Sequence, residues 1–235
     1  MNENWLSKTE MLLGEDSLNK LKSSTVAVFG CGGVGSYTLD SLVRTGIGNI
    51  VLFDKALIEV TNLNTNLMAD TKVVGKYKVD IAKKRLLNIN PDLNIKIVKE
   101  YINEKNASRL ILNNFDYIVD TIDSISDKVA LIAEAIRKKI PIISSMGTGD
   151  KFDPTQFEVT DISKTTSCPF ATLLKSELKS KGIEHLKVIY SKEKPTRFRS
   201  TESNYRAQMS SISFVPSFAG LIISSEVIKD LINKN

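Results

Sequence analysis

The sequence has few of the side chains that bind soft metals or form disulfides. Its 235 residues include two cysteines, Cys31 and Cys168, and a single histidine, His185. No Cys-x-x-Cys pair is present, which argues against a zinc clip, and two distant cysteines do not make a disulfide framework. One histidine argues against a histidine-rich metal centre and against a Ser-His-Asp triad. We therefore expect a protein of the reducing cytoplasm.

Long apolar runs are also absent. None approaches the roughly 18 residues that a membrane-spanning helix needs. The start, Met1-Asn2-Glu3-Asn4, lacks the basic and apolar regions of a secretory signal. A content of 42% hydrophobic and 25% charged residues is typical of a globular protein with one sizeable core. We expect no membrane span.

What the sequence does contain is a glycine-rich turn between a strand and a helix. Residues 25–29 predict a buried strand, and residues 36–44 have apolar side chains at helical spacing. The turn between them supplies the candidate phosphate contacts Gly30, Gly32, Gly33, Val34 and Gly35. Glycines permit a tight turn, and a helix start offers free N–H groups to an anion. The alternative is that these glycines only allow the helix to pack closely on the sheet.

An acidic residue follows the next strand. Residues 49–53 predict a second strand that ends at Asp54, 24 positions after Gly30. A carboxylate in this place of a strand–helix–strand unit can bind ribose hydroxyls. Together, the glycine turn and Asp54 predict a nucleotide site.

The remaining pattern predicts an α/β fold with a mainly parallel sheet flanked by helices. We expect residues 1–150 to form a nucleotide-binding core and residues 151–235 to be an extension that completes the same domain. The further strands are expected at 93–98, 117–119, 140–144, 156–160 and 186–190. The further helices are expected at 5–22, 76–90, 107–113, 126–138, 168–181 and 213–232.

Two polar stretches follow predicted strands. The connection 59–70 contains Asn62 and Asn64, which either line a pocket at the carboxyl ends of the strands or form a solvated turn. The fourth strand ends in Asp120 and Asp123. We expect Asp120 to be structural and Asp123 to hold Mg²⁺, which prefers oxygen ligands, although either aspartate can instead cap the next helix.

The segment 191–206 is polar and basic. It carries Phe198 and Tyr205 among lysines and arginines, a composition that suits contact with a nucleic-acid backbone and stacking on its bases. A solvated loop is the alternative interpretation, because charged polar segments often bury nothing.

Several motifs occur in the order found in the ThiF/MoeB/HesA superfamily, relatives of ubiquitin-activating enzymes. The chain resembles that superfamily in the glycine turn, 44–48 (Arg-Thr-Gly-Ile-Gly), Asp54, 62–64 (Asn-Leu-Asn), 75–78 (Gly-Lys-Tyr-Lys), 89–91 (Ile-Asn-Pro) and Asp120-x-x-Asp123. The second half is similar to the dehydratase branch, in 146–149 (Met-Gly-x-Gly), 153–156 (Asp-Pro-Thr-Gln), 159–165 and 213–216.

This resemblance implies a Rossmann-like adenylation fold that uses ATP and Mg²⁺, with a monovalent cation in addition. The superfamily activates a carboxylate by adenylation. In the dehydratase branch that carboxylate belongs to threonylcarbamoyladenosine in tRNA, and ring closure then gives a cyclic hydantoin with net loss of water. One alternative is adenylation of the carboxyl terminus of a sulfur-carrier protein. Another is a nucleotide-binding partner protein without catalysis.

The resemblance also implies roles for individual residues. Asp54 would bind the ribose, Asn62 and Asn64 would contact the nucleotide or the metal shell, Lys78 would pair with phosphate oxygens, and Asp123 would hold Mg²⁺. Relatives use a cysteine in the loop after the core, which makes Cys168 a candidate for covalent chemistry, although ring closure requires no thiolate. The implied partners are tRNA rather than DNA, a second copy of the chain, and a sulfur-relay protein.

Two positions depart from the family pattern. Thr65 stands where the family usually has an arginine, and Lys8 stands where an amino-terminal arginine usually reaches the phosphates of the neighbouring subunit. Lysine supplies a charge but not the bidentate fork of a guanidinium. We therefore expect slower catalysis, or compensation by another cation such as Arg44.

Overall fold

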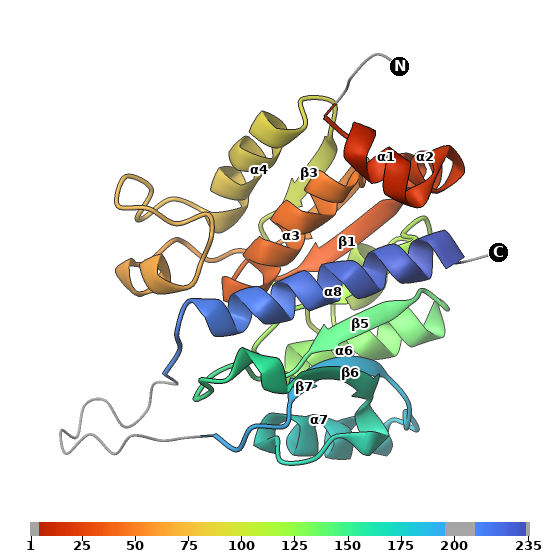
Figure 1. Ribbon diagram of the computed structural model, residues 1–235. Coiled ribbons are helices and arrows are strands. Elements are labelled where there is room, and N and C mark those ends of the chain that lie inside the picture. The colour runs from red at the N-terminus through yellow and green to blue at the C-terminus, as the bar shows by residue number, and fades with distance from the viewer. Residues whose placement is uncertain (1–4, 196–209, 234–235) are drawn as a thin grey trace.

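The computed structural model describes residues 5–195 and 210–233. Its centre is a seven-stranded sheet in the order β3-β2-β1-β4-β5-β7-β6 (Figure 1). The strands are β1 (Thr25–Phe29), β2 (Asn49–Phe53), β3 (Asn94–Val98), β4 (Tyr117–Asp120), β5 (Ile142–Ser145), β6 (Phe157–Asp161) and β7 (Lys187–Ser191). All pairings are parallel except that of the edge strand β6 with β7. The expected α/β class is thus confirmed.

Helices cover both faces of this sheet. The α-helices are α1 (Ser7–Leu13), α2 (Glu15–Ser23), α3 (Gly33–Thr45), α4 (Lys78–Ile89), α5 (Ala107–Leu110), α6 (Ile125–Arg137), α7 (Pro169–Ser180) and α8 (Phe214–Asn233). Three short 3₁₀ helices, η1 (Val60–Asn64), η2 (Pro154–Gln156) and η3 (Ile162–Lys164), lie in the loops of the described chain. Helices α3, α4 and α8 lie on the face toward the viewer in Figure 1, and α6 and α7 lie behind the sheet.

The core is divided by the alternation of side chains along the central strand. Val26 and Val28 of β1 belong to the apolar cluster under α3, α4 and α8, whereas Ala27 and Phe29 belong to the cluster under α5, α6 and α7. Successive side chains of a strand point to opposite faces, so a fully apolar strand fills both clusters. This burial on both faces explains why strands 25–29 and 49–53 read as continuous apolar runs.

The helix bounds differ from the sequence expectation in several places, and α5 ends at Leu110 rather than at residue 113. The amino-terminal helix is broken into α1 and α2 at Gly14, whose φ of +83° interrupts the regular helix. Helix α3 begins at Gly33 rather than at Ser36, because the last glycines of the turn already have helical geometry. No helix within the described residues combines the length and apolarity that a bilayer span requires.

The last helix closes the face that contains α3. Thr38 donates a hydrogen bond to the carbonyl of Gly220 (3.1 Å), and Ser224 donates to Ser41 (2.7 Å). A Cβ atom at Gly220 would lie 2.5 Å from the carbonyl oxygen of Val34, so only glycine allows this approach. The strands and helix after residue 150 therefore share one sheet and one core with those before it. Most of the basic segment, with Phe198 and Tyr205, lies outside the described residues.

Candidate active site

The glycine turn between β1 and α3 is held against β4. Gly30 has φ +99°, and a Cβ atom there would lie 2.7 Å from Thr121. The Thr121 hydroxyl lies 3.0 Å from the carbonyl oxygens of both Phe29 and Gly30. A Cβ atom at Gly35 would lie 2.1 Å from the Gly30 carbonyl oxygen, whereas one at Gly32 would meet nothing within 4 Å. Gly30 and Gly35 are thus required for the turn, and Gly32 leaves its backbone open to a ligand.

The carboxylate of Asp54 supports the turn from the end of β2. One oxygen accepts a hydrogen bond from the amide of Cys31 and the other from the amide of Ala56, both at 2.7 Å. The buried Asn66 completes the arrangement by donating to the Cys31 carbonyl at 2.8 Å. Burial, with the nearby Asp54 charge, raises the pKa of the Cys31 thiol far above its usual value, so that thiol stays protonated.

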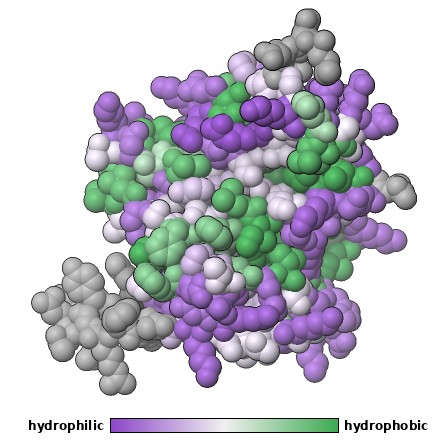
Figure 2. Space-filling model, in the orientation of Figure 1, coloured by the Kyte–Doolittle hydropathy of each residue, from purple (hydrophilic) through white to green (hydrophobic). Residues whose placement is uncertain are grey.

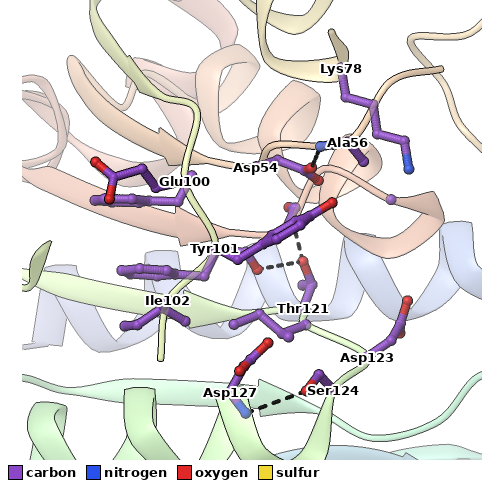
Figure 3. A pocket seen from close by; sticks show the side chains of 15 residues that line it. Asp54, Ala56, Lys78, Glu100, Tyr101, Ile102, Thr121, Asp123, Ser124 and Asp127 are labelled. Atoms are coloured by element: carbon purple, nitrogen blue, oxygen red, sulfur yellow. Dashed lines mark hydrogen bonds between the residues drawn. The ribbon is translucent and has the colours of Figure 1, made fainter. Parts of the chain in front are cut away.

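A cavity of about 320 Å³ opens beside this turn, at the carboxyl ends of the central strands. Its lining residues are Phe29, Gly30, Gly32, Phe53, Asp54, Ala56, Lys78, Glu100, Tyr101, Ile102, Thr121, Ile122, Asp123, Ser124 and Asp127. Figure 3 shows the Tyr101 ring lying across this cavity between Asp54 and Thr121. The position agrees with the rule that open α/β sheets bind ligands at the carboxyl ends of their strands.

Asp123 and Lys78 are both in the cavity wall. Lys78 is the first residue of α4 and is half-buried, while the side chain of Asp123 is open to the cavity. Loss of hydration in the cavity raises the pKa of the Asp123 carboxyl, and the charges of Lys128 and Lys78 oppose that rise. Because both groups line one cavity, Lys78 can pair directly with an anionic ligand that Asp123 holds through a metal ion.

Asp120 is fixed beneath the cavity by a buried ion pair. Its Oδ2 lies 2.9 Å from Lys128 Nζ and accepts a hydrogen bond from Ser144 at 2.7 Å, while Oδ1 accepts one from the amide of Ile122 (3.1 Å). Asp120 and Lys128 have no exposed surface. The geometry therefore gives Asp120 a structural role: it holds the β4–α6 loop that carries Asp123.

Several of the sequence-derived candidates do not line the cavity. Gly33, Val34 and Gly35 form the first turn of α3 behind the cavity wall. The Asn62 side chain accepts from the amide of Glu59 (3.1 Å), and that of Asn64 donates to the carbonyl of Ser211 (3.3 Å). In this state both asparagines shape the connection 59–70, and their contact with a nucleotide stays a prediction.

Thr65 and Lys8 stand where the family has arginines, and Arg44 was considered as a substitute. The structure places these three residues in different parts of the fold. Thr65 is beside the turn, since a Cβ atom at Gly33 would lie 3.3 Å from its Cβ. Arg44 lies in the last turn of α3, at the far end from the turn, and binds Asp40 at 2.5 Å. It therefore does not compensate within its own chain, which corrects that expectation. Lys8 is exposed on α1, near the amino ends of the strands, and does not line its own chain's cavity (Figure 1).

Cys168 is poorly placed for covalent chemistry. It is buried, caps the amino end of α7 through a 3.5 Å contact from the amide of Ala171 to its sulfur, and does not line the cavity. This arrangement accounts for the residue without a reactive role.

Residues that sequence reasoning missed make up much of the cavity. Thr121, Tyr101 and Asp127 line it, and Asn66 holds the turn from outside. The strand-then-polar pattern signalled Asp123 but gave no sign of Tyr101, which follows β3 and comes from a part of the chain without any motif. Burial, together with the charges of Asp54 and Glu59, raises the pKa of Tyr101.

The donor set suits a magnesium ion shared with phosphates. Among the described residues there is no group of three or more histidine, cysteine or acidic side chains that would enclose a metal. Mg²⁺ is commonly bound by one or two carboxylates together with substrate phosphates and water. The open carboxylate of Asp123, near the charge of Lys78, fits that mode and does not fit a closed protein cage.

Comparisons with known proteins agree with this geometry. The family model described as "ThiF family" matches residues 6–235. The tRNA threonylcarbamoyladenosine dehydratase of Bacillus subtilis (strain 168) is 40% identical over 238 residues, covering 96% of this chain and 94% of that protein. The protein of the same name from Escherichia coli (strain K12) is 38% identical over 172 residues, 73% of this chain and 64% of that protein.

Solved structures show the same likeness. The E. coli dehydratase TcdA in complex with ATP has a TM-score of 0.90 and 32% identity, and the match covers 97% of this chain and 94% of that one. The complex of the same enzyme with AMP also has a TM-score of 0.90. The resemblance to the dehydratase branch is thus confirmed, and the chain belongs to the ThiF family.

Proposed function

We propose that this chain is an ATP-dependent enzyme that cyclises threonylcarbamoyladenosine in tRNA. The observation that carries the proposal is the cavity at the carboxyl ends of the strands, which joins an open glycine turn, Asp54, Lys78 and Asp123. The 40% identity to the B. subtilis dehydratase, over nearly the whole of both chains, supports the substrate. The fold likeness to a dehydratase complexed with ATP supports the nucleotide.

The chemistry begins with a poor electrophile. A carboxylate oxygen of the substrate attacks the α-phosphorus of ATP, and pyrophosphate leaves. A nitrogen of the substrate's own carbamoyl group then attacks the activated carbonyl carbon and loses its proton as AMP leaves. The net change in the nucleoside is the loss of one water. Both steps need alignment and neutralisation of phosphate charge more than they need a protein nucleophile.

The residues of the cavity divide this work. The amide groups at the start of α3 and the ammonium group of Lys78 would bind phosphate oxygens. Asp54, already fixed by two amide hydrogen bonds, would accept from the ribose hydroxyls. Asp123 would hold Mg²⁺, which neutralises charge on the phosphates and the leaving pyrophosphate. A monovalent cation is proposed on the family resemblance.

We also propose that the active form is a homodimer in the cytoplasm. Large apolar side chains are exposed on α8 and on α1, namely Phe218, Leu221, Met11 and Leu12. Figure 2 shows hydrophobic atoms gathered over both helices on one face. Lys8 lies on α1, outside the lining of its own cavity, and in this proposal it reaches phosphates bound by a second copy. A sulfur-relay protein is proposed as a further partner on the resemblance.

The direct test uses the full chain with ATP, Mg²⁺ and tRNA that carries the uncyclised nucleoside. Digestion and mass spectrometry should show a nucleoside lighter by one water, with one AMP formed for each ring. Asp123→Asn should bind ATP without Mg²⁺ as well as the wild type but lose turnover. Pyrophosphate release that requires a carrier protein instead of tRNA would overturn the proposal. So would nucleotide binding without any turnover.

The dimer has its own measurement. Light scattering after gel filtration should give twice the chain mass, and Phe218→Lys should halve it. Lys8→Ala should leave the mass unchanged and slow turnover, because the partner's cavity would lose one cation. If the wild type is a monomer with full activity, the proposed dimer is refuted and the proposed reaction still stands.

A further inference from the structure

Two carboxylates of the cavity wall, those of Asp123 and Asp127, have no hydrogen-bond partner within the described residues. Glu100 is another acidic residue of the cavity wall, but its carboxylate forms an ion pair with the Arg109 guanidinium, with 2.6 Å between the charged atoms. Asp123 lies within the field of Lys78, at the end we assign to phosphate. Asp127 needs a separate explanation.

The cavity has a polar end and an apolar end. The polar end contains the open backbone of Gly32, with Asp54 and Lys78. The apolar end is walled by Ile102 and Ile122, from the loops after β3 and β4. A nucleotide with phosphates at the turn and ribose at Asp54 must place its flat base at this apolar end. This placement rests on the proposed function.

Asp127 is the carboxylate at the apolar end. Figure 3 shows it on α6, with its oxygens directed toward Ile102 and Thr121 and into the cavity. Its backbone amide binds the hydroxyl of Ser124, the residue that caps the helix, in a long contact of 3.5 Å. The reciprocal bond of a capping box, in which the Ser124 amide donates to the Asp127 carboxylate, is not formed within the described residues. Helix capping therefore leaves both carboxylate oxygens for a ligand.

We infer that Asp127 is a specificity-determining residue that binds the 6-amino group of adenine. An ionised carboxylate only accepts hydrogen bonds. Adenine presents such a donor, the amino group at its position 6. Asp127 accepts a hydrogen bond from this amino group, and a purine that lacks the group loses that bond. This role concerns nucleotide choice, and it is separate from the phosphate chemistry of Asp123.

The test is calorimetric binding to the full chain in the absence of tRNA, so that catalysis is not required. The ligands are ATP and purine riboside triphosphate, which is ATP without its 6-amino group. The wild type should bind ATP about ten- to hundredfold more tightly than purine riboside triphosphate, as expected for a hydrogen bond to a charged group. Asp127→Ala should bind both with equal affinity. Asp127→Asn keeps an acceptor oxygen but loses the charge, so it should retain a smaller preference for ATP over purine riboside triphosphate.

Glu177→Gln is the matched control. It removes one negative charge from α7 in a neighbouring groove that Asp127 also borders, but it lies outside the cavity. This control variant should keep the wild-type ratio of the affinities for ATP and purine riboside triphosphate. If Asp127→Ala keeps the wild-type preference for ATP over purine riboside triphosphate, the inference fails while ATP binding stands. If the wild type binds no ATP, the proposed function fails and this inference falls with it.

Discussion

The buried pair of Lys128 and Asp120 leads to a prediction about stability. Both side chains have no exposed surface, and their charged atoms lie 2.9 Å apart. Removing one member of such a pair leaves an uncompensated charge in the core, which typically costs about 3–5 kcal/mol. Lys128→Met keeps most of the side-chain volume, so cavity formation adds little. Asp120 keeps its bonds from Ser144 and Ile122, and we therefore expect a loss near 3 kcal/mol.

The assay is urea unfolding followed by far-ultraviolet circular dichroism. Domains of this size have stabilities of about 5–15 kcal/mol, so the variant should still fold. The double variant Lys128→Met with Asp120→Asn removes both charges and should recover most of the loss. The reasoning is refuted if Lys128→Met costs less than about 1 kcal/mol, or if the double variant is no more stable than Lys128→Met alone.

Two further predictions concern the turn and the acid stability of the fold. Gly35→Ala places a Cβ atom 2.1 Å from a carbonyl oxygen and should destabilise the chain by more than about 3 kcal/mol, whereas Gly32→Ala should melt like the wild type and weaken only nucleotide binding. Lys187→Met removes a 2.7 Å ion pair with Glu226 and should cost about 1–2 kcal/mol at neutral pH. Burial raises the pKa of Glu226, but hydrogen bonds from Lys187 and Lys229 outweigh it and hold the pKa below its usual value. That stabilisation is present above the unfolded pKa of about 4.3 and is lost as the pH falls through the pKa of the folded state. The free energies of unfolding of the wild type and of Lys187→Met should therefore converge at acid pH.

Local pattern was enough to predict the fold of the first half. Residues 25–29 and 49–53 are apolar throughout because the strands are buried on both faces, and Gly30 and Asp54 follow them at the sheet edge. The turn could be recognised because its glycines are needed for backbone geometry, which any ligand-free structure must also satisfy. Asp123 was found by the same logic, since it follows a strand.

The rest of the site depends on contacts that no local pattern contains. Thr121 binds the turn across 91 positions of sequence, and Asn66 reaches Cys31 from a loop that looked merely polar. Tyr101 follows β3 and enters the cavity only because β3 lies beside β2 in the sheet. Arg44 was considered as a substitute cation because it follows the turn in sequence, but the length of α3 carries it to the other end of the helix.

The position of α8 has a consequence for how the chain is made. This helix is the last element, yet its Pro216 lies against Gly33 of the glycine turn, and its Gly220 lies against Val34. Thr38 of α3 and Gly220 are 182 positions apart, so a growing chain leaves the outer face of α3 uncovered until α8 has been made. Until then the chain exposes an apolar face that chaperones and proteases can recognise.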